Sequence, residues 1–568
     1  MLRLAAVAAV LACLFAVPST ATPEQGTELL PGVTFQKAVQ FTSHGPVVID
    51  EILGPKPGGL YSLVPALAGN TVSGGLATVA QLETAAATSA SAVVGINGDS
   101  FSAKGYPTGI VLQNGVLVHG AFSSRASIGV DGGGTLHVKR VSFTGTWNGA
   151  GQRRPLAGVN EIPRAGQVVL FTPGWGSTTP SVPGASEVVI EPFPAATPDT
   201  DLTGAVTAQA TTGGGTAIPS DGAVLMSVGS TGALPSLLDD APLGSKVTVR
   251  LILASDWSAV TNAIGGGPVL VANGKPVFHT SESFVAGALA QDEARAGVGQ
   301  LADGRLLLVA VDGDQPGYSA GISLYDLART MAQLGAVTAA AVDSGPSVTA
   351  AFDGQLLSRP RATGGGPVKE ALLLEYDGVY APPPSVPVLG QTDAAAGEQL
   401  AYTIVRPSTV TATVSSPSGQ VSTVDSGGRD PGTYRFTWSS LDTEGTYHWT
   451  VDATDNQNQQ SVADETFQYD VTLSSLTVSK TASAQTGVAV HFRLSRAATA
   501  TLQIETPTGT AVRMLPSVQL AAGANVLRWD GTLADGSTRV YPGTYVARVT
   551  AVSAVGTMDE TAAFVLRR

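Results

Sequence analysis

The sequence predicts an α+β domain, in which a mixed sheet packs against helices, followed by two all-β immunoglobulin-like sandwiches. Three observations predict this order. A strand, a capped helix and a second strand follow one another over residues 305–343. Three consecutive prolines lie in the segment 380–388, where they favour an extended spacer over a sheet. Beyond them, apolar and polar residues alternate as they do in strands.

The composition supports a secreted, strand-rich protein. The 568 residues include 67 Gly and 35 Pro, only 13% are charged, and the net charge is −13. This length predicts several domains, and so many turn-forming residues are typical of multi-strand proteins. Binding to nucleic acid requires a basic face, and the scattered Lys and Arg residues exclude it.

The first 21 residues have the pattern of a signal peptide. Arg3 precedes the apolar run Leu4–Val17, and the small residues Ser19–Ala21 follow it. The only cysteine, Cys13, lies inside this segment, so we expect no disulfide, thiol nucleophile or cysteine-based zinc site in the mature protein. No later stretch is apolar and long enough to span a bilayer. The sequence therefore predicts secretion or location at the cell surface.

The α+β domain is expected to span residues 28–378. Short strands alternate with one helix over 28–90, and Val79 and Leu82 face the core at helical spacing. Asn-Gly pairs at 114–115 and 273–274 predict tight hairpins.

The clearest helix is predicted over residues 323–335. Ser323 is the expected N-cap, Asp326 follows three residues later, and Gly335 lies at the C-terminal end. The helix has one apolar face, so we expect it to pack on the sheet.

A Pro-rich linker, 379–388, leads to sandwiches predicted over 389–470 and 471–568. Each contains a Gly-Thr-Tyr turn followed by alternating apolar and polar residues. The second resembles the immunoglobulin-like module of flagellar-hook-capping proteins. The resemblance rests on Trp529, Asp530, Gly531, Asp535, Gly536, Pro542, Gly543, Thr544 and Tyr545. We expect a role in structure, spacing or attachment rather than in chemistry.

Four aspartates lie in turns of the first domain: Asp99, Asp256, Asp312 and Asp343. Aspartate is common in turns, so each alone is a weak candidate for catalysis. However, Asp312 and Asp343 end the two strands that flank one helix, which would bring their carboxylates together. Two carboxylates across a sugar ring are what glycosidic cleavage needs. The three aspartates 99, 312 and 343 could also hold Ca²⁺ or Mg²⁺, although no ligand spacing demands a metal.

Two further features suggest contacts with an anion. The glycines Gly265, Gly266 and Gly267 enter a strand, where their amides could approach an anion or simply form a tight turn. Arg295 follows a polar loop and could clamp a phosphate or lie on the surface. The six histidines form no metal pattern, and we expect a plain loop role for His279, the one nearest the presumed cleft.

Several segments between residues 90 and 376 together resemble the phosphodiester glycosidase family. They are "VVGINGDSFS", "VVLFTPGWGSTT", "NAIGGGPVLVANGKPV" and the long segment from "ARAGVGQL" through "VDGDQPGYS" to "QLGAV". The resemblance implies hydrolysis of the bond between the anomeric carbon of a sugar and a phosphodiester. The residues that match motif-bearing positions are Asn97, Gly98, Asp99, Gly265, Gly266, Gly267, Arg295, Asp312 and Asp343.

The resemblance also implies roles for these residues. Asp343 or Asp312 would activate water or stabilise an oxocarbenium-like centre, with Asp99 as a rival base. Arg295 and the amides of the glycine turn would bind the phosphate, and Asn97 and Gly98 would shape the sugar-phosphate site.

The chain departs from the family pattern in three places. Ser344 and Pro346 interrupt a D-G-G-G-S motif, Asp314 stands where the family often has Arg, and 365–371 replaces E-R-P-V-x-N-A. In this last segment Gly365, Gly366 and Glu370 remove an Arg and an Asn. Two arginines of the family pattern are thus missing, at positions 314 and 366, for which Arg359, Arg361 or Lys369 could compensate.

Three functions are therefore considered. The first is a secreted hydrolase of sugar-1-phosphodiesters in cell-surface polysaccharide, held near its polymer by the sandwiches. The second is a catalytically weakened protein that binds a sugar phosphate or surface polysaccharide. The third is a structural or adhesive protein whose sandwiches carry the function.

Overall fold

The computed structural model describes most of the chain after residue 25. The described residues are 26–120, 124–211, 213–229, 237–253, 257–278, 282, 284, 287–394, 396–479, 482–483 and 487–567. The expected signal peptide, Cys13, Asp256 and His279 lie outside them. The chain divides into two compact units, of which the first is residues 1–58, 62–85 and 94–374 and the second 59–61, 86–93 and 375–568.

The first unit is built almost entirely of strands, so the α+β prediction is wrong. Its described helices are α1 (Val79–Ala86), the four-residue α2 (Leu237–Asp240) and α3 (Leu324–Gln333), with short 3-10 turns η1 (Ala68–Asn70) and η3 (Gly345–Ser347). The predicted strand–helix–strand segment does form. However, the many turn residues elsewhere join strand to strand, so one helix does not imply a sheet layered with helices.

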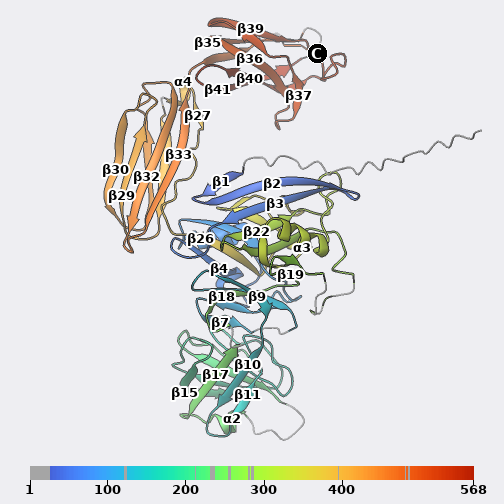
Figure 1. Cartoon of the computed structure of the whole chain (residues 1–568), viewed down its shortest axis with the longest axis vertical. Helices are drawn as coiled ribbons and strands as arrows, with labels where there is room; N and C mark the ends of the chain where they lie inside the picture. The colour runs from blue at the N-terminus through green and yellow to red at the C-terminus, as the bar shows by residue number, and fades with distance from the viewer. Residues whose placement is uncertain are drawn as a thin grey trace, which may run out of the picture. The chain divides into compact units, whose positions relative to one another are not determined.

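Helix α3 packs on an eight-stranded sheet in the order β1-β2-β3-β22-β21-β23-β19-β20 (Figure 1). The strands are β1 (Thr27–Leu30), β2 (Val33–Thr42), β3 (Gly45–Gly54), β19 (Val269–Ala272), β20 (Lys275–Pro276), β21 (Arg295–Leu301), β22 (Leu306–Val311) and β23 (Ala336–Ala341). Ser323 is the N-cap, since its Oγ accepts the Asp326 N–H at 3.1 Å. Leu327 and Met331 of the helix are fully buried against the sheet.

A second sheet, in the order β25-β24-β5-β26-β4, carries the strand ends that matter most for the site. Its strands are β4 (Tyr61–Leu67), β5 (Ala92–Asn97), β24 (Ala350–Phe352), β25 (Gln355–Leu356) and β26 (Glu370–Tyr376). Every residue of β5 is buried, as are six of the seven in β26. Such continuous apolar runs fit strands that are covered on both faces.

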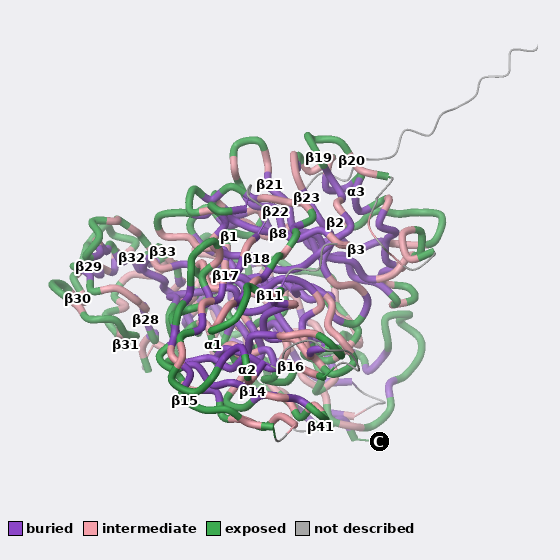
Figure 2. The backbone as a smooth tube through the Cα atoms, turned by 90° about the horizontal axis from the view of Figure 1, so that it is seen from below, coloured by how far each residue is buried: buried purple, intermediate pink, exposed green. Residues whose placement is uncertain are grey.

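Two further sheets complete this unit. The first has the order β7-β6-β18-β8-β9 and comprises β6 (Val111–Gln113), β7 (Val116–His119), β8 (Ala126–Asp131), β9 (Leu136–Arg140) and β18 (Val260–Gly265). The second has the order β11-β10-β17-β15-β14-β16-β13-β12. Its strands are β10 (Phe143–Asn148), β11 (Arg154–Leu156), β12 (Gly158–Val159), β13 (Val168–Phe171), β14 (Ala185–Ile190), β15 (Asp201–Ala210), β16 (Ala223–Val228) and β17 (Lys246–Leu253). Figure 2 shows the buried backbone of inner strands such as β8, β18 and β22.

Both predicted Asn-Gly hairpins are confirmed. Asn114 and Gly115 join β6 to β7 with φ of 49° and 79°, and Asn273 and Gly274 join β19 to β20 with φ of 51° and 72°. Positive φ at both central residues is the requirement of a type I′ turn, which asparagine and glycine meet at low cost.

The second unit contains two sets of packed sheets, each with its own core. One set has the orders β27-β33-β32-β29-β30 and β28-β31, and the other β34-β35-β39 and β37-β36-β40-β41, with β38 beside β36. The strands are β27 (Val388–Leu389), β28 (Glu398–Ile404), β29 (Ser408–Ser415), β30 (Val421–Arg429), β31 (Gly432–Trp438), β32 (Gly445–Asp455), β33 (Gln460–Tyr469), β34 (Leu473–Val478), β35 (Val488–Leu494), β36 (Ala498–Glu505), β37 (Ala511–Met514), β38 (Val518–Leu520), β39 (Gly523–Trp529), β40 (Gly543–Val552) and β41 (Thr557–Leu566). Helix α4 (Gln391–Ala394) follows β27. Trp449 and Trp529 are buried in the two cores, as anchors of sandwiches usually are.

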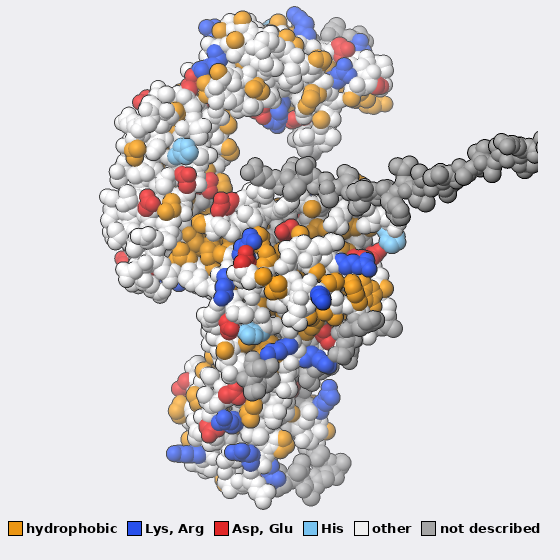
Figure 3. Space-filling view, viewed as in Figure 1, with side chains coloured by type: hydrophobic (Ala, Val, Ile, Leu, Met, Phe, Trp, Pro, Cys, Tyr) orange, Lys and Arg blue, Asp and Glu red, His pale blue; other side chains and the backbone are white. Residues whose placement is uncertain are grey.

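The visible surface mixes charges of both signs. Figure 3 shows Lys and Arg interspersed with Asp and Glu on this face, in line with the scattered basic residues of the sequence. Within the described residues, no helix has the length and apolar character needed to cross a membrane.

Glu83 is an ionisable residue buried beneath the β24–β25 hairpin. It lies on α1, is 1% exposed, and accepts the Gly354 N–H at 2.9 Å through Oε2. Burial raises the pKa of Glu83 to about 8, from an ordinary value of 4.5. Between these two pH values the folded protein holds a proton that the unfolded chain releases, so the first unit loses stability as the pH rises.

We therefore expect Glu83→Gln to remove part of this pH dependence. Glutamine keeps an acceptor for the Gly354 N–H and carries no charge at any pH. The free energy of unfolding of the wild type should fall by up to about 3–5 kcal/mol more than that of the variant between pH 5 and pH 8. Denaturant unfolding at both pH values measures this, with the exposed Glu28→Gln as control. Equal slopes for wild type and Glu83→Gln would contradict the prediction.

Candidate active site

Three carboxyl groups meet where three strands begin or end. Asp99 follows β5 by two residues, Asp343 follows β23 by two residues, and Glu370 is the first residue of β26. Backbone hydrogen bonds hold these segments together, because Asp343 N donates to Gly98 O at 3.0 Å and Gly98 N to Glu370 O at 2.8 Å. We call these three residues, together with Arg125, the carboxylate cluster.

The side chain of Asn97 holds together the backbone segments that carry Asp99 and Asp343. Its side chain is fully buried, and Nδ2 donates to Asp343 O at 3.0 Å while Oδ1 accepts the Thr349 N–H at 3.2 Å. Its side-chain amide thus joins the end of β5 to the turn after β23. The structure places Asn97 as a positioning residue for Asp343.

Asp99 and Arg125 form a buried ion pair. Arg125 Nη2 lies 2.8 Å from Asp99 Oδ1, and the side chains are 19% and 1% exposed. Arg125 Nη1 also donates to Ser100 Oγ at 2.9 Å, and the guanidinium lies 5.6 Å from the centre of the Phe284 ring. Burial raises the pKa of Asp99, and the charge of Arg125 opposes this rise. The arginine thus favours the ionised form of a carboxyl group that water does not reach.

Glu370 lies against this pair and has a different protonation preference. Its Oε1 accepts the Asp99 N–H at 3.4 Å, and its Oε2 has no hydrogen-bond partner among the described residues. Complete burial, and then the charge of Asp99, raise the pKa of Glu370 well above its usual value. The neutral carboxylic acid is therefore favoured, which keeps a third negative charge out of the cluster.

Asp343 is the member of the three whose residue is partly exposed. Its Oδ2 accepts the Ser347 Oγ–H at 2.7 Å. Burial raises the pKa of Asp343, and Asp99 raises it further, while Ser347 and Arg125 oppose the rise. Asp343 is thus the carboxyl group that can meet a substrate and change protonation near it.

Glycines surround the cluster because side chains would not fit. A Cβ on Gly98 would lie 2.6 Å from Glu370 Cγ, and one on Gly109 would lie 2.7 Å from Asp99 Oδ2. A Cβ on Gly265 would overlap Asp99 Oδ2. Gly98 and Gly265, which the sequence singled out, therefore make room for the carboxyl groups.

The backbone amides of Gly266 and Gly267 already donate hydrogen bonds within the protein. Gly266 N donates to Ala126 O at 3.1 Å, and Gly267 N donates to Ala341 O at 2.8 Å. These two donors were expected to face an anion, and in the structure they hold neighbouring strands instead.

Asp312 lies apart from the carboxylate cluster. Strand β21 separates β22 from β23, so the strands that end near Asp312 and Asp343 are not neighbours. Asp312 instead accepts the Arg359 N–H at 3.0 and 3.1 Å and the Tyr318 hydroxyl at 3.1 Å. Nearby Asp50 forms an ion pair with Lys37. Burial raises the pKa of Asp50 to about 7, with Asp312 adding to the rise and Lys37 opposing it.

The guanidinium of Arg295 also forms an ion pair and hydrogen bonds within the protein. It is 4% exposed, pairs with Glu293 Oε1 at 2.8 Å, and donates through Nη2 to the carbonyls of Ala288 and Gln291 at 2.7 and 3.0 Å. These contacts anchor the loop before β21, so its guanidinium is mostly occupied rather than open to a phosphate.

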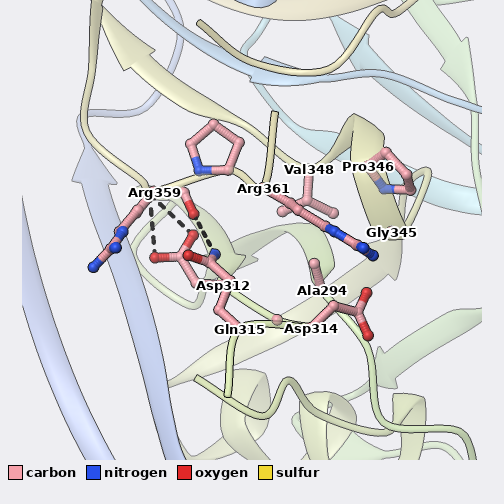
Figure 4. Close-up of a pocket in the computed structure, with 11 residues that line it drawn as sticks. Ala294, Asp312, Asp314, Gln315, Gly345, Pro346, Val348, Arg359 and Arg361 are labelled. Carbon is pink, nitrogen blue, oxygen red and sulfur yellow. Dashed lines mark hydrogen bonds between the residues drawn. The ribbon is translucent and has the colours of Figure 1, made fainter. Parts of the chain in front are cut away.

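A pocket beside Asp312 includes two of the positions at which the sequence departs from the family pattern, Asp314 and Pro346. It is lined by Ala294, Asp312, Gly313, Asp314, Gln315, Gly345, Pro346, Val348, Arg359, Pro360 and Arg361 (Figure 4). Two of the three basic residues considered as replacements, Arg359 and Arg361, lie here. Lys369 does not, because its buried Nζ donates to the carbonyls of Ala68, Thr71 and Gly75 at 3.1, 2.8 and 2.9 Å.

The sequence analysis did not point to Arg125, and it noted Glu370 only as a departure from a family motif, not as a site residue. A second signal for Glu370 is its place at the start of the apolar run "ALLLEY", where a charged residue in a buried strand needs a reason. Arg125 comes from a loop whose path depends on the fold. Among the described residues, no three or more His, Cys, Asp or Glu side chains are grouped to hold a metal ion.

Comparison with known families agrees with this architecture. Residues 199–375 match the phosphodiester glycosidase family, and residues 476–554 match the FlgD Ig-like domain. The first match includes Asp343 and Glu370, and Asp99 and Arg125 precede it. The chain thus carries a domain of the phosphodiester glycosidase class. The match to this family rests on residues 199–375, and residues 476–554 are similar to a FlgD-type immunoglobulin-like domain.

One solved structure shares the fold at low identity, and two further structures match with lower scores. A hypothetical protein from Synechocystis has a TM-score of 0.53 and 24% identity, covering 63% of this chain and 64% of its own. The chain therefore spans slightly less than two thirds of that neighbour. A putative exported protein from Burkholderia pseudomallei has a TM-score of 0.47 and 22% identity over 58% and 74% of the chains. The zebrafish N-acetylglucosamine-1-phosphodiester alpha-N-acetylglucosaminidase catalytic domain has a TM-score of 0.34 and 15% identity over 63% and 88%. Comparison with curated proteins gives no match.

The packing around Asp99 predicts that Gly265→Ala is costly. The added methyl group would overlap Asp99 Oδ2 and displace the carboxylate from Arg125. We expect the free energy of unfolding to fall by about 1–3 kcal/mol, as for other overpacked cores. Gly132→Ala is the control, because that position has open space around it and no left-handed φ. Equal stability of the two variants in denaturant unfolding would show that the site is packed more loosely than described.

Proposed function

We propose that the first unit is a hydrolase of glycosyl phosphodiesters. It would cleave the bond between the anomeric carbon of a sugar and the phosphodiester oxygen in a cell-surface polysaccharide. The observation that carries the proposal is the partly exposed Asp343 beside the buried Asp99–Arg125 pair, within a domain matched to this family.

The chemistry needs few groups. A phosphodiester is a good leaving group, so strong protonation of the leaving oxygen matters less than in an ordinary glycoside. A carboxylate is needed to activate water or to stabilise the oxocarbenium-like transition state. Asp343 fits this role because it is partly exposed and has two partners that hold it, Ser347 through its side chain and Asn97 through its backbone carbonyl.

Arg125 would stabilise the negative charge of the leaving phosphodiester. Its side chain is 19% exposed, and Asp99 and Ser100 fix its direction. Donors that are oriented in advance stabilise developing charge without reorganisation. The neutral form of Glu370 supports this role, because an additional buried carboxylate would repel the substrate.

The alternative is a protein that binds a sugar phosphate or surface polysaccharide without cleaving it. The departures at Asp314, Pro346 and Glu370 favour it, as do the occupied contacts of Arg295 and of the Gly266 and Gly267 amides. In either case we propose that the protein acts outside the cell, as residues 1–21 predict, and that the sandwiches hold it near its polymer.

Asp343→Asn is the variant that tests the hydrolase. With UDP-N-acetylglucosamine or an aryl ester of N-acetylglucosamine-1-phosphate as substrate, we expect kcat to fall by about 10²–10⁴-fold, the usual effect of losing a catalytic carboxylate. Asp303→Asn, an exposed position paired with Arg305, is the matched control. Unchanged kcat in Asp343→Asn would overturn the role of Asp343. Binding without turnover in the wild type would establish the alternative.

The pH dependence of turnover supplies an independent test through Arg125. If Asp343 acts in its ionised form, activity is lost as the pH falls through its pKa, which burial and Asp99 raise above 3.8. Arg125 opposes that rise, so Arg125→Met should move the acid limb of the kcat profile to higher pH. The variant should also be slower at every pH. An acid limb that stays in place would separate Arg125 from Asp343.

A further inference from the structure

The pocket beside Asp312, which we call the Arg361 pocket, is lined by two exposed charged residues, Arg361 and Asp314, and the charge of Asp314 also acts on Arg295. Asp312 is engaged by Arg359 N and Tyr318, and the Arg359 guanidinium lies 4.4 Å from the centre of the Tyr318 ring. Arg361 and Asp314, in contrast, form no hydrogen bond or ion pair with any described residue. Figure 4 shows the Arg361 guanidinium and the Asp314 carboxylate on the same side of this pocket.

Apart from Gln315 and the charged residues, the lining is apolar or glycine. Pro346, Pro360 and Val348 supply hydrocarbon surface, and Gly345 is held by its N–H bond to Ala294 O at 2.9 Å. The empty space is about 250 Å³, part of which is open solvent. The enclosed part has room for little more than one water-sized group, so a hydroxyl could enter it while the rest of a sugar ring lay over its mouth.

The charges of Arg361 and Asp314 determine which hydrogen-bonding groups a ligand in this pocket must have. A guanidinium only donates hydrogen bonds, and a carboxylate only accepts them. An isolated anion would be repelled by Asp314, and an isolated cation by Arg361. Each hydroxyl of a vicinal diol can accept from one and donate to the other, while the C–H face of the ring packs on proline. A neutral saccharide is a ligand class that can hydrogen-bond to both charged groups at once and also pack on the prolines.

We propose that the Arg361 pocket is a saccharide subsite that binds the vicinal diol of a sugar unit near the scissile bond. This rests on the proposed function, because the pocket borders the 3-10 turn η3, which follows Asp343 directly. A sugar held by Arg361 and Asp314 lies beside the catalytic carboxylate without touching it. The subsite therefore contributes to the affinity for the polymer, whereas the carboxylate cluster performs the chemical step.

Binding can be tested without turnover. Methyl glycosides of N-acetylglucosamine, glucose, galactose and mannose, which lack phosphate, are titrated into the full chain by ligand-observed NMR. At least one should bind, and Arg361→Met and Asp314→Asn should each weaken it about tenfold or more, as expected for a charge-assisted hydrogen bond. Arg153→Met and Asp199→Asn are the controls. Arg153 is an exposed arginine, and Asp199 shares the positive φ of Asp314, 62° against 56°.

The kinetic measurement separates this inference from the proposed function. With an N-acetylglucosamine-1-phosphodiester that carries a further sugar, Arg361→Met should raise KM about tenfold and leave kcat unchanged. Normal KM together with normal glycoside binding would overturn the subsite while the hydrolase stands. Glycoside binding that depends on Arg361, in a protein without turnover, would support the subsite and overturn the hydrolase. Loss of inorganic phosphate binding alone in Arg361→Met would mean that the pocket is an anion site, which also overturns the inference.

Discussion

The first unit depends on one buried ion pair, Asp99 with Arg125. Two charges removed from water are costly unless their geometry is good and the remaining polar atoms find partners. The structure meets most of this condition with the hydroxyl of Ser100, with glycines at 109 and 265 that leave space for the carboxylate, and with a neighbouring Glu370 that favours its neutral form. Arg125 Nε, however, is buried without a hydrogen-bond partner among the described residues. The arrangement of backbone around the site therefore follows from the need to accommodate this pair.

Local signals in the sequence predicted local structure well. The cap of α3 at Ser323 and the hairpins at 114–115 and 273–274 depend on residues close in the chain, and the structure contains all three. The predicted fold class was wrong, because the arrangement of strands into sheets depends on pairings between segments that are distant in the sequence. The insertion of β21 between β22 and β23 is such a pairing, and it separates Asp312 from Asp343.

A position directly after a strand pointed to only part of the candidate site, since Asp312 follows β22 and yet lies apart from the carboxylate cluster. Asp99 and Asp343 stand out because each ends an apolar run, and the structure brings them into electrostatic contact. Arg125 and Glu370 have no comparable signal, since their importance comes from where distant loops and strands meet. Conversely, the sequence suggested that Arg295 could bind a phosphate, but in the structure its guanidinium pairs with Glu293 and donates to a carbonyl of the preceding loop. A charged residue in a sequence does not reveal whether the protein itself already uses it.

The hydrogen bond from Gly98 to Glu370 also constrains when the carboxylate cluster can form. It joins residues 272 positions apart, and β5 is incomplete without the neighbouring β26, which ends only at Tyr376. A chain still being synthesised, or one held unfolded during export, cannot assemble the site before this late strand arrives. Contacts of such long sequence separation form slowly, because chain entropy must be lost before they are made. The topology itself therefore delays any activity until biosynthesis of the first unit is complete.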